Sequence, residues 1–239
     1  IINSFNERGF SMITTVDVET SWQVTSTGGY DPSPFHPDNI LVSVGINDEY
    51  YFTNHSERID KGCYHKIQSV LDKTTLLIGH NIKFDLMWLL ESGFKYSGKV
   101  YDTMLGEYIL NRGIRKSLTL EMSCRRRKIG SKDNRIKEYT DRGIPFQNIP
   151  ADVVEEYGRM DVEITRRLFD SQMSDLKMAK NKGLLMTAKM MNEFLIVLSD
   201  MERNGINIDL DDLSKVEKEY RAEFAYLKQK IDKIVYDKM

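Results

Sequence analysis

The chain has 239 residues, of which 41% are hydrophobic and 29% charged, and 34 Lys+Arg against 36 Asp+Glu give a net charge of −2. This composition excludes intrinsic disorder, which requires low hydrophobicity together with high net charge. It also argues against a dedicated nucleic-acid-wrapping protein, which would usually be basic overall, so any basic surface must be local. The two cysteines cannot form a disulfide framework, and they indicate a reducing, cytoplasmic compartment.

Neither a membrane helix nor a signal peptide is expected. The longest apolar runs, Leu86–Leu90 and Phe194–Leu198, have five residues each, whereas a membrane helix needs about 20. The start of the chain lacks the basic and apolar regions of a signal peptide. Because the chain begins at Ile1 and stops within a helical pattern at Met239, we expect it to be a piece of a longer protein.

The first half of the chain predicts strands alternating with helices. Ser11–Thr20 is rich in β-branched residues and short enough for a buried strand. Residues 40–46 and 50–53 flank Asn47-Asp48, which predicts a hairpin. The other elements expected here are a turn-rich stretch at 26–39, helices at 56–73 and 84–91, and a strand at 75–79. This alternation favours an α/β or α+β fold with a central sheet.

The middle of the chain is predicted to be helical, with one basic interruption. Helices are expected at 102–111 and 151–176. Between them, Arg112–Lys128 holds seven basic residues and a single acid, Glu121. This is the strongest local charge imbalance in the chain.

The last 55 residues predict two long helices. The first, 184–201, is amphipathic and ends at Asn204-Gly205, where glycine favours a left-handed cap. Asp209 is expected to cap the second helix, along which apolar residues recur at alternating steps of three and four, as in a coiled-coil seam. Two such helices joined by a tight turn predict a hairpin arm, so we place a domain boundary near residue 180.

The first of three acidic motifs lies on the expected first strand. Asp17 and Glu19 are two residues apart, so their carboxylates project from the same face. Burying such a pair costs several kcal/mol unless something compensates, and a divalent cation would do so. The alternative is a strand end with two solvated acids.

The other two motifs lie on expected helices. Asn81 and Asp85 are four residues apart at a helix start, as are Tyr157 and Asp161 within a later helix, so each pair shares one helical side. Taken alone, the first pair is also what a helix cap followed by a first-turn acid would give. The second pair could be a core tyrosine beside a surface acid.

Taken together, four carboxylates and a tyrosine predict a site for two hard metal ions. Mg²⁺ prefers carboxylate, water and phosphate oxygens. Two such ions can activate a water and stabilise the leaving oxygen of a phosphodiester. Without metal, the four acids would repel one another and raise at least one pKa.

The order of these motifs resembles the 3′→5′ exonucleases of the DEDD class. The histidine subtype would carry His at the position of Glu156, so the tyrosine subtype fits. The surrounding segments resemble the proofreading domain of family A, DNA polymerase I-like enzymes of bacteria and phages, and they are VDVETS, IGHNIKFDLMWL, YDTMLGEYILN and FQNIPADVVEEYGRMDVEIT. MERNGINID resembles the junction where that domain passes into the polymerase thumb.

The resemblance implies a ribonuclease H-like α/β exonuclease fold with a central mixed sheet over residues 1–180. Residues 181–239 would be the truncated start of the thumb, a helical hairpin. The implied enzyme is a 3′→5′ exodeoxyribonuclease that proofreads by hydrolysing the 3′-terminal phosphodiester of single-stranded or frayed DNA. Its partners would be that DNA end and the rest of the polymerase chain, with no membrane. The family's polymerase motifs lie beyond the thumb and are absent here, so no nucleotide addition is expected. We favour a phage source and thus the host cytoplasm.

The resemblance also implies a role for each acid with two Mg²⁺ or Mn²⁺ ions. Asp17, Glu19 and Asp161 would hold the ion that carries the attacking water, and Asp17, with Asp85 through waters, would hold the second. Tyr157 would orient the water, because a phenol with a pKa near 10 is a poor base at neutral pH.

Substrate contacts are expected around the 3′-terminal nucleotide. The resemblance places Thr20 and Asn81 there and Arg115 at a phosphate. Where relatives often carry a wedging leucine, this chain departs with Gln23. Trp22 would either stack on a base or cover the core.

Two neighbouring features have structural alternatives. The run Arg125–Lys128 would either contact phosphates or form a solvated loop. His80 is expected to bond a backbone partner, because a hard oxygen site does not need a histidine.

Two other functions remain open. One is a stand-alone RNA-processing 3′→5′ exonuclease of the same class. The other is a catalytically silent scaffold that keeps the exonuclease fold to support a polymerase.

Overall fold

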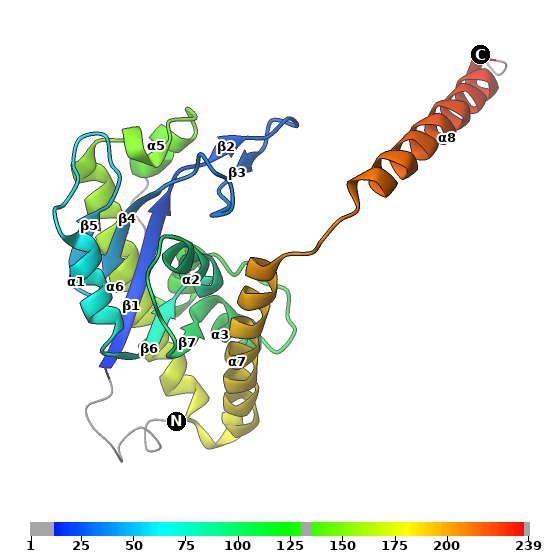
Figure 1. Ribbon diagram of the computed structural model, residues 1–239. Helices are drawn as coiled ribbons and strands as arrows, with labels where there is room; N and C mark the ends of the chain where they lie inside the picture. Colours follow the sequence, from blue (N-terminus) through cyan, green and yellow to red (C-terminus); the bar gives the residue numbers. More distant parts are fainter. Residues whose placement is uncertain (1–11, 131–134, 237–239) are drawn as a thin grey trace. The chain divides into compact units, whose positions relative to one another are not determined.

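The structure is a computed structural model that describes residues 12–130 and 135–236 (Figure 1). It divides into two compact units, and the boundary along the chain lies between Asp200 and Met201. Ser11, the first residue of the strand expected at 11–20, lies outside the described residues.

The first unit is built on a five-stranded mixed sheet with β1 at its centre. In the order β5-β4-β1-β6-β7, the strands span Glu49–Phe52, Leu41–Ile46, Met12–Thr20, Thr74–Gly79 and Lys99–Asp102. β1 is antiparallel to β4 and parallel to β6, which is parallel to β7. The register with β4 shifts between Glu19 and Thr20, so the strand is irregular directly after the first acidic motif.

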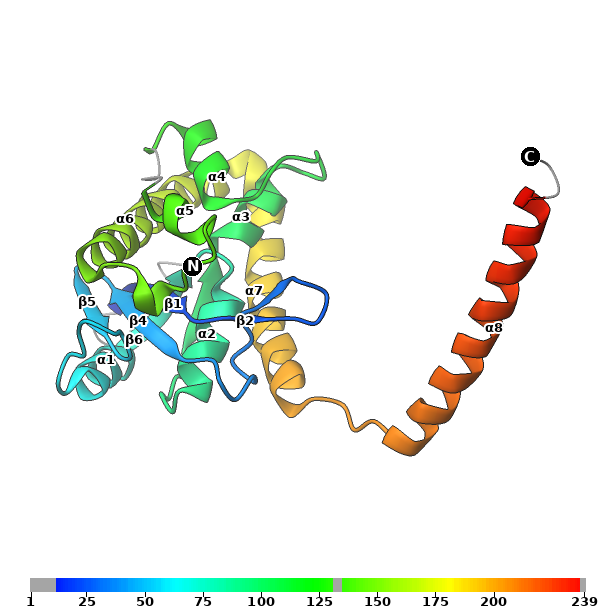
Figure 2. The ribbon, with the colours of Figure 1, turned by 90° about the horizontal axis from the view of Figure 1, so that it is seen from above.

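Helices cover both faces of this sheet (Figures 1 and 2). The seven α-helices of the described residues in this unit are α1 Cys63–Leu71, α2 Ile82–Glu91, α3 Thr103–Leu110, α4 Leu120–Arg127, α5 Arg135–Thr140, α6 Ala151–Leu176 and α7 Lys182–Asn204, which runs on past Asp200. Val16 and Val18 pack in one core cluster with α1 and α2, whereas Ile13 packs with α6. Because side chains alternate along a strand, Asp17 and Glu19 lie on the face that α6 covers. The α/β architecture that we expected is confirmed.

Helix α7 packs against the first unit, beyond the boundary expected near residue 180. Leu195 belongs to the same core cluster as Val16 and Val18. The buried Asn192 accepts a 2.7 Å hydrogen bond from the backbone N–H of Asp102. The compact unit therefore extends to Asp200. The assignment of residues 181–239 to a polymerase thumb stays a prediction.

The second unit contains α8, Leu210–Tyr236, and both helix caps that we predicted are confirmed. Gly205 has a left-handed φ of 67°, and its N–H bonds the carbonyl of Met201 at 3.1 Å. The Asp209 carboxylate accepts from the N–H groups of Asp211 and Asp212 at 3.0 and 3.1 Å. No described residue of α8 is buried. The hairpin pairing of α7 with α8 stays a prediction. None of the helices in the described ranges carries an apolar stretch sufficient to cross a bilayer.

Short elements account for most differences from expectation. Strand β7, helix α5 and the hairpin of β2 (Gln23–Val24) with β3 (Tyr30–Asp31) were not predicted. The helix expected at 56–73 begins only at Cys63. Before it, the Asp60 carboxylate accepts the N–H of Phe52 at 2.9 Å, and Gly62 adopts a left-handed φ of 72°. These contacts hold the preceding residues against β5 as a loop.

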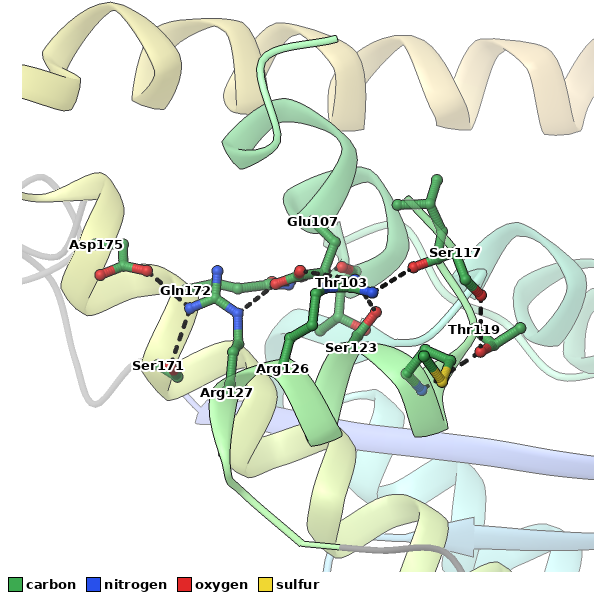
Figure 3. A network of polar contacts seen from close by, with 12 residues as sticks. Thr103, Glu107, Ser117, Thr119, Ser123, Arg126, Arg127, Ser171, Gln172 and Asp175 are labelled. Atoms are coloured by element: carbon green, nitrogen blue, oxygen red, sulfur yellow. Dashed lines mark hydrogen bonds and ion pairs between the residues drawn. The ribbon is translucent and has the colours of Figure 1, made fainter. Parts of the chain in front are cut away.

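Helix α4 is fixed to α3 and α6 by a polar network around Glu107 (Figure 3). The Glu107 carboxylate, only 3% exposed, pairs with both Arg126 and Arg127 and accepts from Gln172 Nε2 at 3.1 Å. Arg127 also pairs with Asp175 at 2.7 Å. The expectation that the whole run Arg125–Lys128 either meets phosphates or is a solvated loop is wrong for its two central arginines, because acids of the protein neutralise them.

We expect Glu107→Ala to lower the free energy of unfolding by about 3 kcal/mol. Removing one partner of a buried pair costs about 3–5 kcal/mol, and the lower end applies because Arg127 is 14% exposed. The matched control is Glu163→Ala, whose exposed pair with Arg167 is worth less than about 0.5 kcal/mol. Urea denaturation measures both, and equal losses would contradict the structural role of Glu107.

Candidate active site

The end of β1 brings two carboxylates to the surface that faces α6. Asp17 is half-buried, while Glu19 and the following Thr20 are buried. Between Glu19 and Thr20 the register with β4 shifts, so that Glu19 pairs with Ser43 and Thr20 with Leu41. The expected projection of both acids from one side of a strand therefore agrees with the fold.

Asp85 reaches the same strand from α2. Its Oδ1 accepts a 3.0 Å hydrogen bond from the backbone N–H of Val18, the residue between Asp17 and Glu19. The Asp85 carboxyl group is 4% exposed. Burial, and next the charge of Asp17, raise the pKa of Asp85 well above its usual range.

Tyr157 and Asp161 reach the acids from α6. Asp161 is buried and Tyr157 is half-buried. Burial raises the pKa of the Tyr157 phenol far above its ordinary value, and the charges of Glu19, Asp161 and Asp17 raise it further. The Tyr157 hydroxyl therefore lies beside the acids of β1 and α6.

Two glycines allow α6 to approach the sheet this closely. A Cβ at Gly158 would lie 2.4 Å from the ring of Tyr50 on β5, and one at Gly45 on β4 would lie 2.8 Å from Val162. Both distances are shorter than a carbon–carbon contact allows. The absence of side chains at these positions thus sets the distance of Tyr157 and Asp161 from β1.

The donor chemistry of this cluster fits hard divalent cations. All the acidic donors are oxygens, and they are largely buried, so their mutual repulsion calls for a positive partner. No three His, Cys, Asp or Glu side chains of the described ranges stand in a ready-made metal cluster. Binding an ion would therefore require the carboxylates to move closer together, as a cation that cancels their repulsion allows.

Asp102 is a further residue of this region that the sequence analysis did not single out. Its Oδ1 accepts from the N–H of Met104 at 2.8 Å, capping α3, and from the N–H of Asn81 at 2.9 Å. Its own N–H bonds Asn192 of α7. An Asp at the very start of an expected helix is a cap pattern that could have identified it. Burial raises the pKa of its carboxyl group.

Asn81 begins α2 in a strained conformation. Its φ of 63° is left-handed, and its exposed side chain makes no capping bond to the helix. The side-chain cap considered as an alternative is therefore wrong. The Asp102 carboxylate holds this backbone, and a strained residue so held at the rim of a candidate site is typical of function.

The other expected substrate residues lie at the rim or away from the acids. The Trp22 ring packs edge-on against Tyr30 and Phe146, with centroids 5.5 and 5.9 Å apart. Gln23 Nε2 donates to the Asp38 carbonyl at 3.4 Å. Arg115 lies on the exposed segment between α3 and α4, and none of the described contacts joins it to the acids.

His80 bonds protein partners, as expected. Its Nε2 lies 2.8 Å from the carbonyl of Leu118, and its Nδ1 lies 2.9 Å from the Thr103 hydroxyl. These bonds tie the end of β6 to α3 and to the segment before α4.

Comparisons with known proteins agree with this geometry. A family model described as 3′-5′ exonuclease, of the family A DNA polymerase type, matches residues 29–177. The match includes Asn81, Asp85, Tyr157 and Asp161, and it begins after the Asp17–Glu19 motif. Strand β1, which carries those two acids, pairs with β4 and β6, and both of these strands lie within the matched region.

Two polymerases are similar in sequence. DNA polymerase I of Borreliella burgdorferi is 28% identical over 144 residues, which cover 60% of this chain and 15% of that protein. A DNA polymerase of Bacillus phage SP01 is 26% identical over 213 residues, which cover 83% of this chain and 23% of that protein. The chain thus spans less than a quarter of the length of either relative.

Solved structures share the fold at low identity. Brucella melitensis NrnC bound to pGG has a TM-score of 0.59 at 18% identity, covering 82% of this chain and 86% of that one. The catalytic core of RRP6 from Trypanosoma brucei has a TM-score of 0.52 at 13% identity, covering 77% and 46%. The fold is the ribonuclease H-like exonuclease fold with a mixed sheet, as expected.

Since the family match covers more than half of the residues, this chain belongs to the 3′-5′ exonuclease domain family of DNA polymerase I-like, family A polymerases.

Proposed function

We propose that the domain is a metal-dependent 3′→5′ exodeoxyribonuclease that removes nucleotides from a single-stranded or frayed 3′ end. In the reaction, a water oxygen bonds to the terminal phosphorus and the bond to the preceding 3′ oxygen breaks. The products are a nucleoside 5′-monophosphate and a strand shortened by one nucleotide. A mispaired end reaches the site more readily, because less base pairing must be broken. The domain would thereby proofread for a larger polymerase chain.

The observation that carries this proposal is the approach of three elements to one end of β1. Asp85 of α2 accepts the N–H of Val18, between Asp17 and Glu19, and the charges of Asp17, Glu19 and Asp161 act on the Tyr157 phenol of α6. A cluster of acids at a strand end is electrostatically unfavourable. Titratable groups with strongly shifted pKa values are found most often at binding and catalytic sites, so the cluster indicates function.

The oxygen-rich cluster would hold two Mg²⁺ or Mn²⁺ ions. Asp17, Glu19 and Asp161 would hold one, and Asp17 with Asp85 through waters the other. Such ions, when bound, polarise a water and stabilise charge on the phosphate and the leaving oxygen. The structure of NrnC with bound Mg²⁺ supports the choice of metal by fold analogy.

Tyr157 would orient the attacking water. Because its pKa is raised, the phenol stays protonated at neutral pH and can donate or accept a hydrogen bond but cannot act as a base. Thr20 and Asn81 would contact the terminal nucleotide from the two sides of the cluster, and Arg115 would contact a phosphate further along the strand.

The direct test compares 5′-labelled single-stranded DNA and RNA oligomers of one sequence. We expect a ladder shortened from the 3′ end on DNA with Mg²⁺ or Mn²⁺, and none with EDTA. Asp17→Ala should abolish both cleavage and the heat of metal binding in calorimetry. Faster cleavage of RNA would support the RNA-processing alternative. Absence of both cleavage and metal heat in the parent protein would support a silent scaffold.

Asp85→Asn should stabilise the metal-free protein at neutral pH while abolishing most activity. The folded state holds the Asp85 proton more tightly than the unfolded chain does, so the free energy of unfolding falls as pH rises from about 4 through the raised pKa. Asparagine removes this fall and still accepts the N–H of Val18. Thermal melting of the parent and the variant in EDTA at pH 5 and pH 7 measures this difference in stability. Cleavage of single-stranded DNA in Mg²⁺ measures the loss of activity. An unchanged pH dependence would contradict the raised pKa.

Tyr157→Phe should lower kcat by roughly 10- to 100-fold with little change in metal affinity, because the water loses its orientation. The parent's rate should show no inflection from this phenol between pH 6 and 9. Tyr139→Phe, a half-buried tyrosine of the same core cluster, is the matched control. Full activity of the Tyr157 variant would exclude the orienting role.

A further inference from the structure

An uninterrupted row of aromatic rings leads from the surface to the candidate site. The rings of Tyr30, Trp22, Phe146 and Tyr157, here called the aromatic row, follow one another with centroid separations of 5.5, 5.9 and 6.3 Å. They come from the β2–β3 hairpin and the segment before it, from the short 3₁₀ helix Phe146–Asn148, and from α6. Two stretches of the chain that are distant in sequence, residues 22–30 and 146–157, thus build one continuous feature.

The exposure of the row decreases toward the acids. Tyr30 is 57% exposed, and the other three rings are half-buried. The inner end is Tyr157, which lies one helical turn before the buried Asp161 on α6. A ligand that enters along the row therefore arrives at the place where the phosphodiester would be cut.

The ring orientations suit bases that bind one at a time. Neighbouring planes in the outer part of the row meet at 73° and 88°, so no two rings can hold a base between them as a sandwich. The ring separations also exceed the roughly 3.4 Å spacing of stacked bases. A strand lying along the row would have its bases unstacked from one another and placed singly against ring faces, which suits any base sequence.

The outer ring lies beside the turn that carries Arg142. A Cβ at Gly143 would lie 3.6 Å from the Tyr30 hydroxyl, so the turn after α5 lies next to this ring. Arg142, the preceding residue, has an exposed side chain. Arg142 therefore adds a positive charge near the outer end of the row, and basic side chains close to aromatic rings are common at single-stranded nucleic-acid sites.

We propose that the aromatic row binds the unpaired bases upstream of the scissile bond, with Tyr30 contacting a base that a dinucleotide is too short to supply. This inference rests on the proposed function and adds an extended subsite for single-stranded DNA to it. Filling the aromatic row requires several consecutive unpaired bases, since each ring face binds one base that is not paired with a complementary strand. A paired end must therefore open by several bases before it occupies the row.

Substrates of increasing length test the subsite in the full 239-residue chain. The set is the p-nitrophenyl ester of thymidine 5′-monophosphate, a deoxydinucleotide and a single-stranded deoxyoctanucleotide. We expect Tyr30→Ala to lower kcat/KM on the octanucleotide by about fivefold or more, through KM, and to leave the ester and the dinucleotide unchanged. Tyr30→Phe, which keeps the ring, should behave as the parent.

The matched control is Tyr108→Ala, because Tyr108 is a similarly exposed tyrosine (51%) on α3 outside the row. Tyr108→Ala should leave kcat/KM unchanged on all three substrates. If Tyr30→Ala lowers kcat/KM equally on all three substrates, or does not lower it on the octanucleotide, the inference is overturned. Cleavage by the parent protein would still support the nuclease function in that case.

A binding measurement keeps the two proposals separable if no cleavage is seen. In EDTA, the octanucleotide should quench the fluorescence of Trp22, and Trp22→Phe should remove the change, since the other tryptophan, Trp88, is buried. Tyr30→Ala should weaken this binding by about fivefold or more. Quenching without cleavage would support binding of DNA by the aromatic row and contradict the nuclease function. An unaltered affinity in Tyr30→Ala would contradict the role of the aromatic row.

Discussion

Like-charged groups crowd one end of β1, and the surrounding structure is arranged to tolerate them. Asp85 is almost fully buried, its pKa is raised, and it accepts a hydrogen bond from the backbone N–H of Val18. The Tyr157 phenol stays neutral in the same field. Such a cluster lowers the stability of the metal-free fold, and the large core on both sides of the sheet offsets this loss.

Long, periodic elements could be predicted from the sequence, and so could the short apolar strands β4, β5 and β6, whereas other short elements could not. The helix expected at 151–176 has those same bounds in α6, because its apolar spacing is regular and Pro150 precedes it. Strand β7, helix α5 and the β2–β3 hairpin have between two and six residues each. Elements of that size contain too few residues to show a clear periodic pattern, and their form depends on the surrounding structure.

The same limit separates the predicted from the missed parts of the site. The acids and Tyr157 could be proposed from the sequence because each motif has a spacing within one strand or helix. Asp102 was missed, since its role depends on Asn81 and Asn192, 21 and 90 residues away. Two arginines of the basic run were misjudged for a related reason. The acids that pair with Arg127 lie 20 and 48 residues away in the chain, so a high local charge was mistaken for an open surface.

Glycine at positions 45 and 158 has an evolutionary consequence. A single methyl group at either place would collide with Val162 or Tyr50 and force α6 outward from the sheet. Every acidic side chain would still be encoded, yet Asp161 on α6 would lie farther from Asp17 and Glu19 on β1. A descendant could in this way lose its nuclease while an inspection of its acids alone would score it as intact. Judging which members of the family keep this candidate site therefore requires checking these two glycine positions together with the acidic ones.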